Sequence, residues 1–291
     1  MTSSTTLPTM PSTAVPRTPG DAPGDAMSSV EPVLTAVKAQ GRAALIGYLP
    51  AGFPSLAGSI DLIAAMVEAG VDVVEVGLPY SDPVMDGPTI QAAADAALAA
   101  GTRVRDVFTV VEKAAAQVPT QEMTYWNTVA RYGVERFAAE LAAAGGAGLI
   151  TPDLIPEEAG TWVAAADSHD LDKVFLVAPS STRARLESTT AQCRGFVYAT
   201  AVMGVTGARE QQSSAAPALV ARTREVTQLP VGVGLGVSTG AQAAGVADYA
   251  DAVIVGSALV RAALDATTPV EAVLAVGQLA AELAAGVRGE L

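Results

Sequence analysis

Short apolar runs alternate with amphipathic stretches along most of the chain, and Gly or Pro marks many of the junctions. Eight of these apolar runs are continuous rather than alternating, which is typical of parallel strands that are covered on both faces. The predicted strands are Arg42–Tyr48, Asp72–Gly77, Glu122–Trp126, Gly146–Thr151, Lys173–Ala178, Gly195–Thr200, Pro230–Gly234 and Asp251–Val255.

Stretches with helical periodicity separate the strands. The clearest are Leu56–Ala69, Thr89–Ala100, Val134–Ala144, Glu157–Ala166, Ala215–Val226 and Thr239–Val246, with Glu31–Gln40 before the first strand and Pro269–Gly286 at the end. Eight alternations without a break in composition predict one closed (β/α)₈ TIM barrel with an extra N-terminal helix. A doubly wound sheet is the competing α/β fold. The strand count and the lack of a Gly-rich loop after the first strand disfavour it.

The first 26 residues differ in composition from the rest of the chain. They are mainly Thr, Ser, Pro, Ala and Gly, with few bulky apolar side chains and no apolar segment of the kind found in secretory signals. The sequence therefore predicts a disordered tail over residues 1–26 and one barrel domain over residues 27–291.

The net charge and the cysteine content indicate which partners and which cellular compartment to expect. The chain has 17 basic and 30 acidic residues, a formal net charge of −13, which disfavours nucleic acid and anionic membranes. The sequence contains no run of eighteen apolar residues, so it predicts no membrane span. The single cysteine, Cys193, excludes an intramolecular disulfide and fits a reducing compartment, so we expect a cytoplasmic protein.

Glu75 interrupts the second apolar run. Its neighbours Val74 and Val76 are expected to face the helices, so Glu75 faces the barrel interior near the C-terminal end of the strand, where barrel enzymes carry their chemistry. Burial would raise the pKa of this carboxyl group, as a general acid/base near neutral pH requires. A buried glutamate that is satisfied by the backbone or by an arginine is an equally good interpretation. Asp82 and Asp86 follow in Asp-Pro and Asp-Gly pairs, which are ordinary turn residues on sequence grounds alone.

Glycines at the ends of the last two strands suggest a phosphate site. Strand 7 runs into Gly234-Leu235-Gly236-Val237-Ser238 and strand 8 into Gly256-Ser257, each before a predicted helix. Backbone N–H groups and a helix N-terminus can bind phosphate there, as in many barrels. Tight turns and helix caps are the alternative. The stretch Ala201–Ser214 after strand 6 is long and contains two glycines, so it predicts either a lid over bound ligand or a mobile linker.

The scarcity of lysine and histidine limits the mechanism. Lys38 and Lys113 fall on helices, while Lys173 and the only histidine, His169, lie at the start of strand 5, at the opposite end of the barrel. A Schiff-base lysine and a zinc site are both excluded, so we expect no metal and proton transfer by carboxylates.

The segment Val74–Gly87 resembles the signature of tryptophan synthase α chains: an acidic strand end, Gly, an aromatic residue, Ser-Asp-Pro and Asp-Gly. Pro88-Thr89-Ile90-Gln91, Pro152–Glu158, Gly204-Val205-Thr206-Gly207 and Gly256-Ser257 agree with that family in order and spacing. The resemblance extends from about Glu31 to the C-terminus.

The resemblance implies cleavage of indole-3-glycerol phosphate to indole and glyceraldehyde 3-phosphate, with Glu75 and Asp86 as the catalytic pair. It implies no cofactor on this chain, pyridoxal phosphate on a partner β subunit, and an α₂β₂ assembly. The substrate-binding residues that it implies are Tyr48, Tyr125, Ile150, Tyr198, Thr206, Gly207, Leu235, Gly236, Gly256 and Ser257. Val202 departs from the family, many members of which have arginine there, and this puts the pairing of a closed lid in doubt.

The sequence alone leaves two alternative functions open. A regulatory subunit with negligible turnover is one, although the intact Glu75–Asp86 pair favours the lyase. A phosphosugar isomerase barrel is the other, but such enzymes carry an acid/base pair on strands 1 and 5, and strand 1 here ends in Tyr48-Leu49-Pro50.

Overall fold

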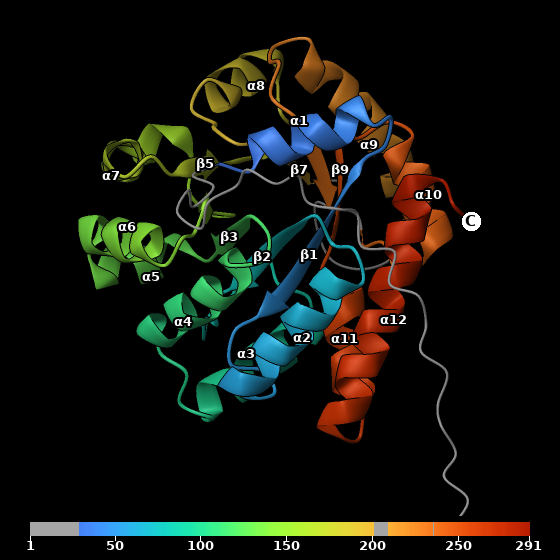
Figure 1. The fold of residues 1–291 in the computed structure, drawn as a ribbon. Helices are drawn as coiled ribbons and strands as arrows, with labels where there is room; N and C mark the ends of the chain where they lie inside the picture. The colour runs from blue at the N-terminus through green and yellow to red at the C-terminus, as the bar shows by residue number, and fades with distance from the viewer. Residues whose placement is uncertain (1–28, 201–208, 235) are drawn as a thin grey trace, which may run out of the picture.

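The computed structural model describes residues 29–200, 209–234 and 236–291, and its strands form one parallel sheet (Figure 1). The strand segments are β1 (Ala44–Pro50), β2 (Val73–Gly77), β3 (Thr120–Met123), β4 (Gly148–Ile150), β5 (Asp172–Val174), β6 (Leu176–Val177), β7 (Val197–Thr200), β8 (Val231–Gly234) and β9 (Ala252–Val255). Their order is β5-β4-β3-β2-β1-β9-β8-β7-β6. Only Phe175 separates β5 from β6, so these two segments are halves of one strand that pairs with β4 and then with β7. The sheet is therefore an eight-stranded TIM barrel, which confirms the predicted fold.

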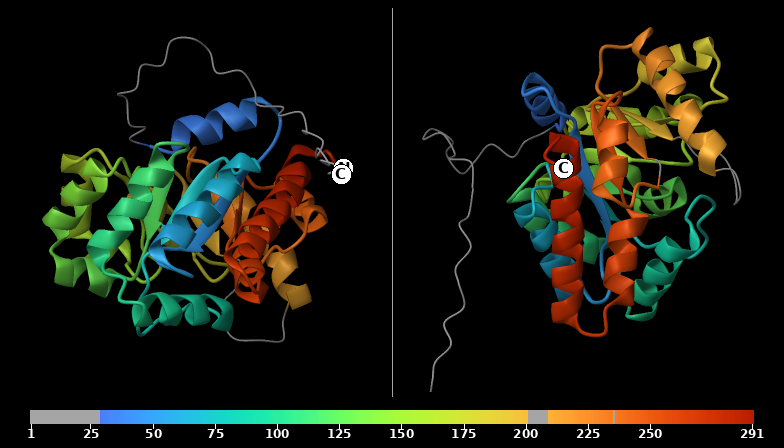
Figure 2. Two further views of the ribbon diagram at one scale, coloured as in Figure 1. Left: turned by 60° about the horizontal axis from the view of Figure 1, so that its bottom comes forward. Right: turned by 90° about the vertical axis from the view of Figure 1, so that its right-hand side faces the viewer.

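Helices form an outer layer around the strands, as both views in Figure 2 show. They are α2 (Leu56–Glu68), α3 (Pro88–Ala99), α4 (Val104–Ala115), α5 (Trp126–Tyr132), α6 (Val134–Ala143), η1 (Pro156–Glu158), α7 (Gly160–Ser168), α8 (Arg183–Thr190), α9 (Arg209–Arg224), α10 (Gly240–Ala247), α11 (Ser257–Asp265) and α12 (Pro269–Arg288).

The two faces of the barrel strands belong to different apolar cores. Val74 and Val76 on β2 pack in the larger core, between the strands and the helices. Val73 belongs to the smaller core, which fills the barrel interior. Because side chains alternate along a strand, Glu75 shares the interior face with Val73, as the sequence predicts.

Helix α1 (Glu31–Ala39) lies across the N-terminal end of the barrel strands. Its side chains Leu34 and Val37, with the preceding Val30, are buried in the interior core. The backbone N–H of Val30 donates to Oδ2 of Asp172 on β5 at 2.9 Å, and Lys38 forms an ion pair with Asp251 at 2.9 Å. These contacts hold α1 over the end of the barrel that lies opposite the C-terminal strand ends.

Among the helices that the structure describes, α12 is long and apolar enough to cross a membrane. It nevertheless packs against α2, α10 and α11, and its residues Val276 and Leu283 are completely buried. This helix is therefore part of the outer layer of the barrel.

Several predicted boundaries are wrong. The third strand begins at Thr120 rather than Glu122, and Trp126 is the first residue of α5. The predicted helix Glu157–Ala166 is a short 3₁₀ turn followed by α7, and Ala159, with φ −84° and ψ 3°, separates the two. Helix α9 begins at Arg209, ahead of the predicted start at Ala215.

Candidate active site

Glu75 is the third residue of β2, between Tyr48 on β1 and Gln121 on β3 in the strand register. Its exposed fraction is 1 %, and neither carboxyl oxygen finds a hydrogen-bond partner within the described part of the chain. Burial raises the pKa of Glu75 to about 8, since no nearby cation offsets the loss of water. Glu75 is therefore mainly protonated at neutral pH and can donate a proton.

Two tyrosines, Tyr48 and Tyr198, share the barrel interior with Glu75. Glycines make room for them: a Cβ atom on Gly77 would overlap the Tyr48 hydroxyl, and one on Gly234 would lie 2.5 Å from the Tyr198 hydroxyl. Burial, with the negative charge of Glu75 as a smaller cause, raises the pKa of both tyrosines. Both hydroxyl groups are therefore neutral hydrogen-bond donors.

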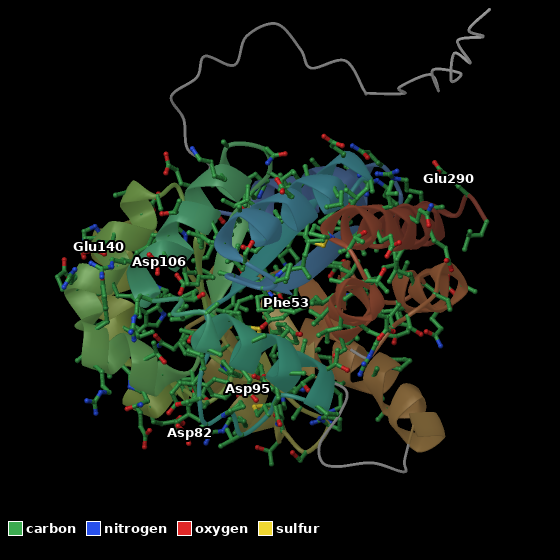
Figure 3. All side chains as sticks on the ribbon, turned by 90° about the horizontal axis from the view of Figure 1, so that it is seen from below. Phe53, Asp82, Asp95, Asp106, Glu140 and Glu290 are labelled. Carbon is green, nitrogen blue, oxygen red and sulfur yellow. The ribbon has the colours of Figure 1, made fainter. Side chains whose placement is uncertain are left out.

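Asp86 lies in the loop between β2 and α3, which Tyr125 holds in place. The Tyr125 hydroxyl donates to Oδ1 of Asp86 at 3.0 Å and accepts from the backbone N–H of Met85 at 3.0 Å. The side chain of Gln91 also donates to the backbone oxygen of Asp86 at 2.7 Å. Burial raises the pKa of Asp86, and the hydrogen bond from Tyr125 opposes this shift. Figure 3, seen from below, labels Asp82 in this loop and Asp95 on the helix that follows.

The ends of β8 and β9 open toward helix N-termini. Gly236 has a φ of +66°, in the left-handed region that favours glycine. After β9, Gly256 precedes α11, whose N-terminus has no side-chain cap, so the first N–H groups of this helix are available to an anion. After β8, Thr239 rather than Ser238 caps α10. Ser257 is the first residue of α11, whereas Ser238 lies two residues before α10.

Some of the remaining predicted site residues lie within the residues that the structure describes, and the others lie outside them. Ile150, at the end of β4, is buried in the interior core, which Tyr198 contacts, and Tyr125 has an exposed fraction of 5 %. Thr206, Gly207 and Leu235 lie outside the described residues, as does Val202. Of the predicted lid Ala201–Ser214, residues 209–214 belong to α9, so the predicted range was too long.

The sequence did not identify Gln121 and Asp172, two polar residues inside the barrel. Gln121 is completely buried beside Glu75, and its Nε2 donates to Oδ2 of Asp172 at 3.2 Å. The sequence signal that could have identified Gln121 was the polar Thr-Gln-Glu run at the start of β3. The predicted strand began at Glu122 and therefore did not include Gln121. In the parts of the chain that are described, no cluster of His, Cys, Asp or Glu could hold a metal ion.

The fold and this arrangement of interior carboxyl group, tyrosines and open helix N-terminus define a (β/α)₈-barrel enzyme. A family model described as "Tryptophan synthase alpha chain" matches residues 34–287. The chain belongs to the tryptophan synthase α chain family.

Individual relatives agree with the family model. The chain is 63 % identical over 263 residues to the tryptophan synthase alpha chain of Salinispora arenicola, covering 90 % of this chain and 98 % of the relative. It is 64 % identical over 252 residues to that of Nocardia farcinica, covering 86 % and 92 %. Among solved structures, the aminoacrylate-bound tryptophan synthase of M. tuberculosis matches with a TM-score of 0.81 and 54 % identity, covering 89 % of this chain and 99 % of that one.

Membership of this family establishes the activity. The protein is a lyase of tryptophan biosynthesis that cleaves indole-3-glycerol phosphate to indole and glyceraldehyde 3-phosphate. The α chain uses no cofactor, since pyridoxal phosphate belongs to the β subunit, which is its partner. The expectations of lyase activity, β-subunit partner and cofactor-free α chain are confirmed.

Proposed function

We propose that Glu75 and Asp86 are the catalytic pair of this lyase. The observation that carries the assignment is the Glu75 carboxyl group, which is buried in the barrel interior, protonated near neutral pH and without a hydrogen-bond partner among the described residues. A group in that state is matched to proton transfer. Asp86, in the next loop, supplies the second carboxylate.

The proposed reaction moves one proton to the indole ring and one from the glycerol chain. Glu75 protonates the ring carbon that bears the glycerol phosphate chain, while Asp86 accepts a hydrogen bond from the indole N–H and stabilises the positive ring. The Glu75 carboxylate then removes the hydroxyl proton of the adjacent carbon. The carbon–carbon bond breaks, its electrons return to the ring, and indole and the aldehyde are released.

Two groups of residues bind the two ends of the substrate in this proposal. Backbone and side-chain groups at the ends of β8 and β9 and in the segment after β7 bind the phosphate: Thr206, Gly207, Gly236, Gly256 and Ser257. The side chains that line the indole pocket are Tyr48, Tyr125, Ile150 and Leu235. Tyr198 lies beside the carboxyl group of Glu75. The uncapped start of α11 supports the first group, and the register of Tyr48 with Glu75 and the interior position of Ile150 support the second.

We further propose that the loops at this end of the barrel dock the β subunit in a cytoplasmic α₂β₂ assembly. Val84 and Met85, in the loop that carries Asp86, have exposed fractions of 78 % and 49 %, and Ile155 after β4 has 45 %. Contiguous exposed apolar surface marks interaction sites, and Val84 and Met85 are adjacent in this loop. Because Asp86 belongs to the same loop, partner binding and active-site geometry are coupled, and by linkage substrate tightens the complex.

Co-purification and an indole-release assay together test these assignments. We expect the chain to bind a tryptophan synthase β subunit and to release indole from indole-3-glycerol phosphate slowly alone and markedly faster with the partner. Glu75→Gln should bind the partner and lose nearly all indole release. A kcat/KM that saturating β subunit leaves unchanged contradicts the coupling, and turnover by Glu75→Gln at the wild-type rate contradicts the catalytic pair.

The composition of residues 1–26 supports their assignment as a tail outside the barrel domain. A segment so poor in apolar side chains can bury little apolar surface, so its deletion should leave activity and Tm unchanged. Thermal unfolding of the truncated and full chains tests this proposal. A Tm lowered by several degrees would show that the tail packs on the barrel.

A further inference from the structure

The barrel interior also holds Asp172, a carboxylate that accepts a hydrogen bond from Gln121, the register neighbour of Glu75. Gln121 is the register neighbour of Glu75 on the adjacent strand and faces the same interior. Its Nε2 donates to Oδ2 of Asp172 on β5 at 3.2 Å. Glu75, Gln121 and Asp172 are all completely or almost completely buried. We call these three residues the interior polar row.

Asp172 fixes the orientation of the Gln121 amide. Its Oδ2 also accepts from the backbone N–H of Val30 at 2.9 Å, and Nε of Arg194 lies 3.5 Å from Oδ1. Burial raises the pKa of Asp172 to about 6, and these contacts oppose the shift, so Asp172 is mainly ionised at neutral pH. An ionised carboxylate is only an acceptor, and it can pair only with the amide nitrogen of Gln121. The amide oxygen therefore remains for the Glu75 side.

The atoms between Gln121 and Glu75 are unpaired. Neither Oε1 of Gln121 nor either oxygen of Glu75 has a hydrogen-bond partner in the described ranges. Adjacent strands lie about 5 Å apart, so rotation of these side chains can bring the two groups into contact. An amide oxygen repels an ionised carboxylate, whereas it accepts a hydrogen bond from the O–H of a neutral carboxyl group.

We propose that Gln121 is a positioning residue for the lyase reaction, with its Oε1 holding the neutral carboxyl group of Glu75 and Asp172 fixing the amide from the other side. This inference rests on the proposed role of Glu75 as the proton donor. Gln121 then favours the protonated form of Glu75 and orients its O–H before the proton is transferred.

The other titratable groups around Glu75 act separately from Gln121. Tyr48 on β1 and Tyr198 on β7 are both neutral, because burial raises their pKa values, and the charge of Asp86 also acts on Tyr48. Arg194 faces Asp172 at the far end of the interior polar row. A substitution at Gln121 leaves all four of these groups in place, so a change in the titration of Glu75 reports on Gln121.

The pH profile of indole release by the full-length chain with its β subunit tests this role. The rate should fall above about pH 8 in the wild type, as Glu75 loses its proton. Gln121→Met keeps the length of the side chain and removes the acceptor. We expect this alkaline limb to move to lower pH by about one unit, the equivalent of one hydrogen bond to the neutral acid. An unmoved limb, or one that moves upward, overturns the role of Gln121.

Asp172→Asn is the second variant, and it tests the same link if Gln121→Met does not fold. A neutral amide at position 172 can donate to Gln121, whose own amide can then turn its nitrogen toward Glu75 and favour the ionised form. The alkaline limb should again move to lower pH, and an unmoved limb contradicts the proposal. Glu122→Gln, on the other face of β3, is the matched control and should leave the profile unchanged. Indole release by Glu75→Gln at the wild-type rate would instead overturn the proposed role of Glu75, so the two failures are distinguishable.

Discussion

Glu75 and Glu122 are two buried glutamates on neighbouring strands that face opposite sides of the barrel wall. Neither has a hydrogen-bond partner for its carboxyl oxygens among the described residues, and burial raises the pKa of both. Glu75 faces the interior, between Tyr48 and Gln121 in the strand register. Glu122 pairs in register with Val76 and Leu149, which both belong to the core under the helices.

The comparison shows that burial and a raised pKa do not by themselves make an active site. Both properties follow from removing a carboxyl group from water, and this happens on either face of the strand wall. What distinguishes Glu75 is its surroundings, which combine neutral hydroxyl donors, a loop with a second carboxylate and an open end of the barrel. Glu122 lacks these neighbours, so we expect its burial only to lower the free energy of unfolding.

The largest expected difference between the two regions is catalytic. Glu75→Gln cannot transfer a proton, so we expect kcat for indole release to fall by about 10²–10⁴-fold or more, with an unchanged circular dichroism spectrum. Glu122→Gln should keep kcat within about twofold. Comparable losses in both variants would show that the two glutamates act through stability alone.

Asp86, the carboxylate in the loop after β2, is the next test. Asp86→Asn keeps an acceptor and removes the charge that stabilises the positive indole ring. We expect a large fall in kcat, on the order of 10²-fold, with a modest change in KM. Steady-state kinetics over a range of substrate concentrations measure both values. An effect on KM alone would assign Asp86 to binding.

Glu122 should affect stability and its pH dependence. The pKa of Glu122 in the folded state is raised above its unfolded value of about 4.5, so at higher pH the folded protein keeps a proton that the unfolded chain releases. The free energy of unfolding therefore falls progressively as the pH rises from about 4.5 toward the raised pKa of the folded state. We expect Glu122→Gln to be about 1–3 kcal/mol more stable than the wild type at pH 8, and less so at pH 5. Urea denaturation at the two pH values measures this difference. A stability gain that is equal at both values would contradict the titration of Glu122.

The smallest expected effect concerns the loop around Asp86. Tyr125→Phe removes the hydroxyl that binds Oδ1 of Asp86 and the N–H of Met85, which should lower kcat/KM by roughly five- to tenfold, about the value of one hydrogen bond. Tyr132→Phe is the control, because its hydroxyl donates to Glu140 in the outer helix layer. Equal losses in both variants would show that the Tyr125 hydroxyl has no special role in the active site.

The sequence predicted the barrel and the inward direction of Glu75, because continuous apolar strands and strict side-chain alternation leave few alternatives. It failed where polar residues occupy strand positions. The predicted third strand began at Glu122 and left out Thr120 and Gln121, the two polar residues at the start of β3. The partners of Gln121 and Tyr125 lie 51 and 39 residues away, at Asp172 and Asp86, and no local pattern encodes such pairs. The proposed roles of Glu75 and Asp86 came from the resemblance to the family rather than from periodicity, and they remain predictions.

Helix α1 covers the end of the barrel at which the strands begin: its apolar side chains are buried in the interior core, and the preceding Val30 donates a hydrogen bond to Asp172. In the proposed reaction, substrate therefore enters and products leave at the opposite end. The same end carries the exposed apolar loops proposed to dock the β subunit. A partner docked there would be the first surface that departing indole meets.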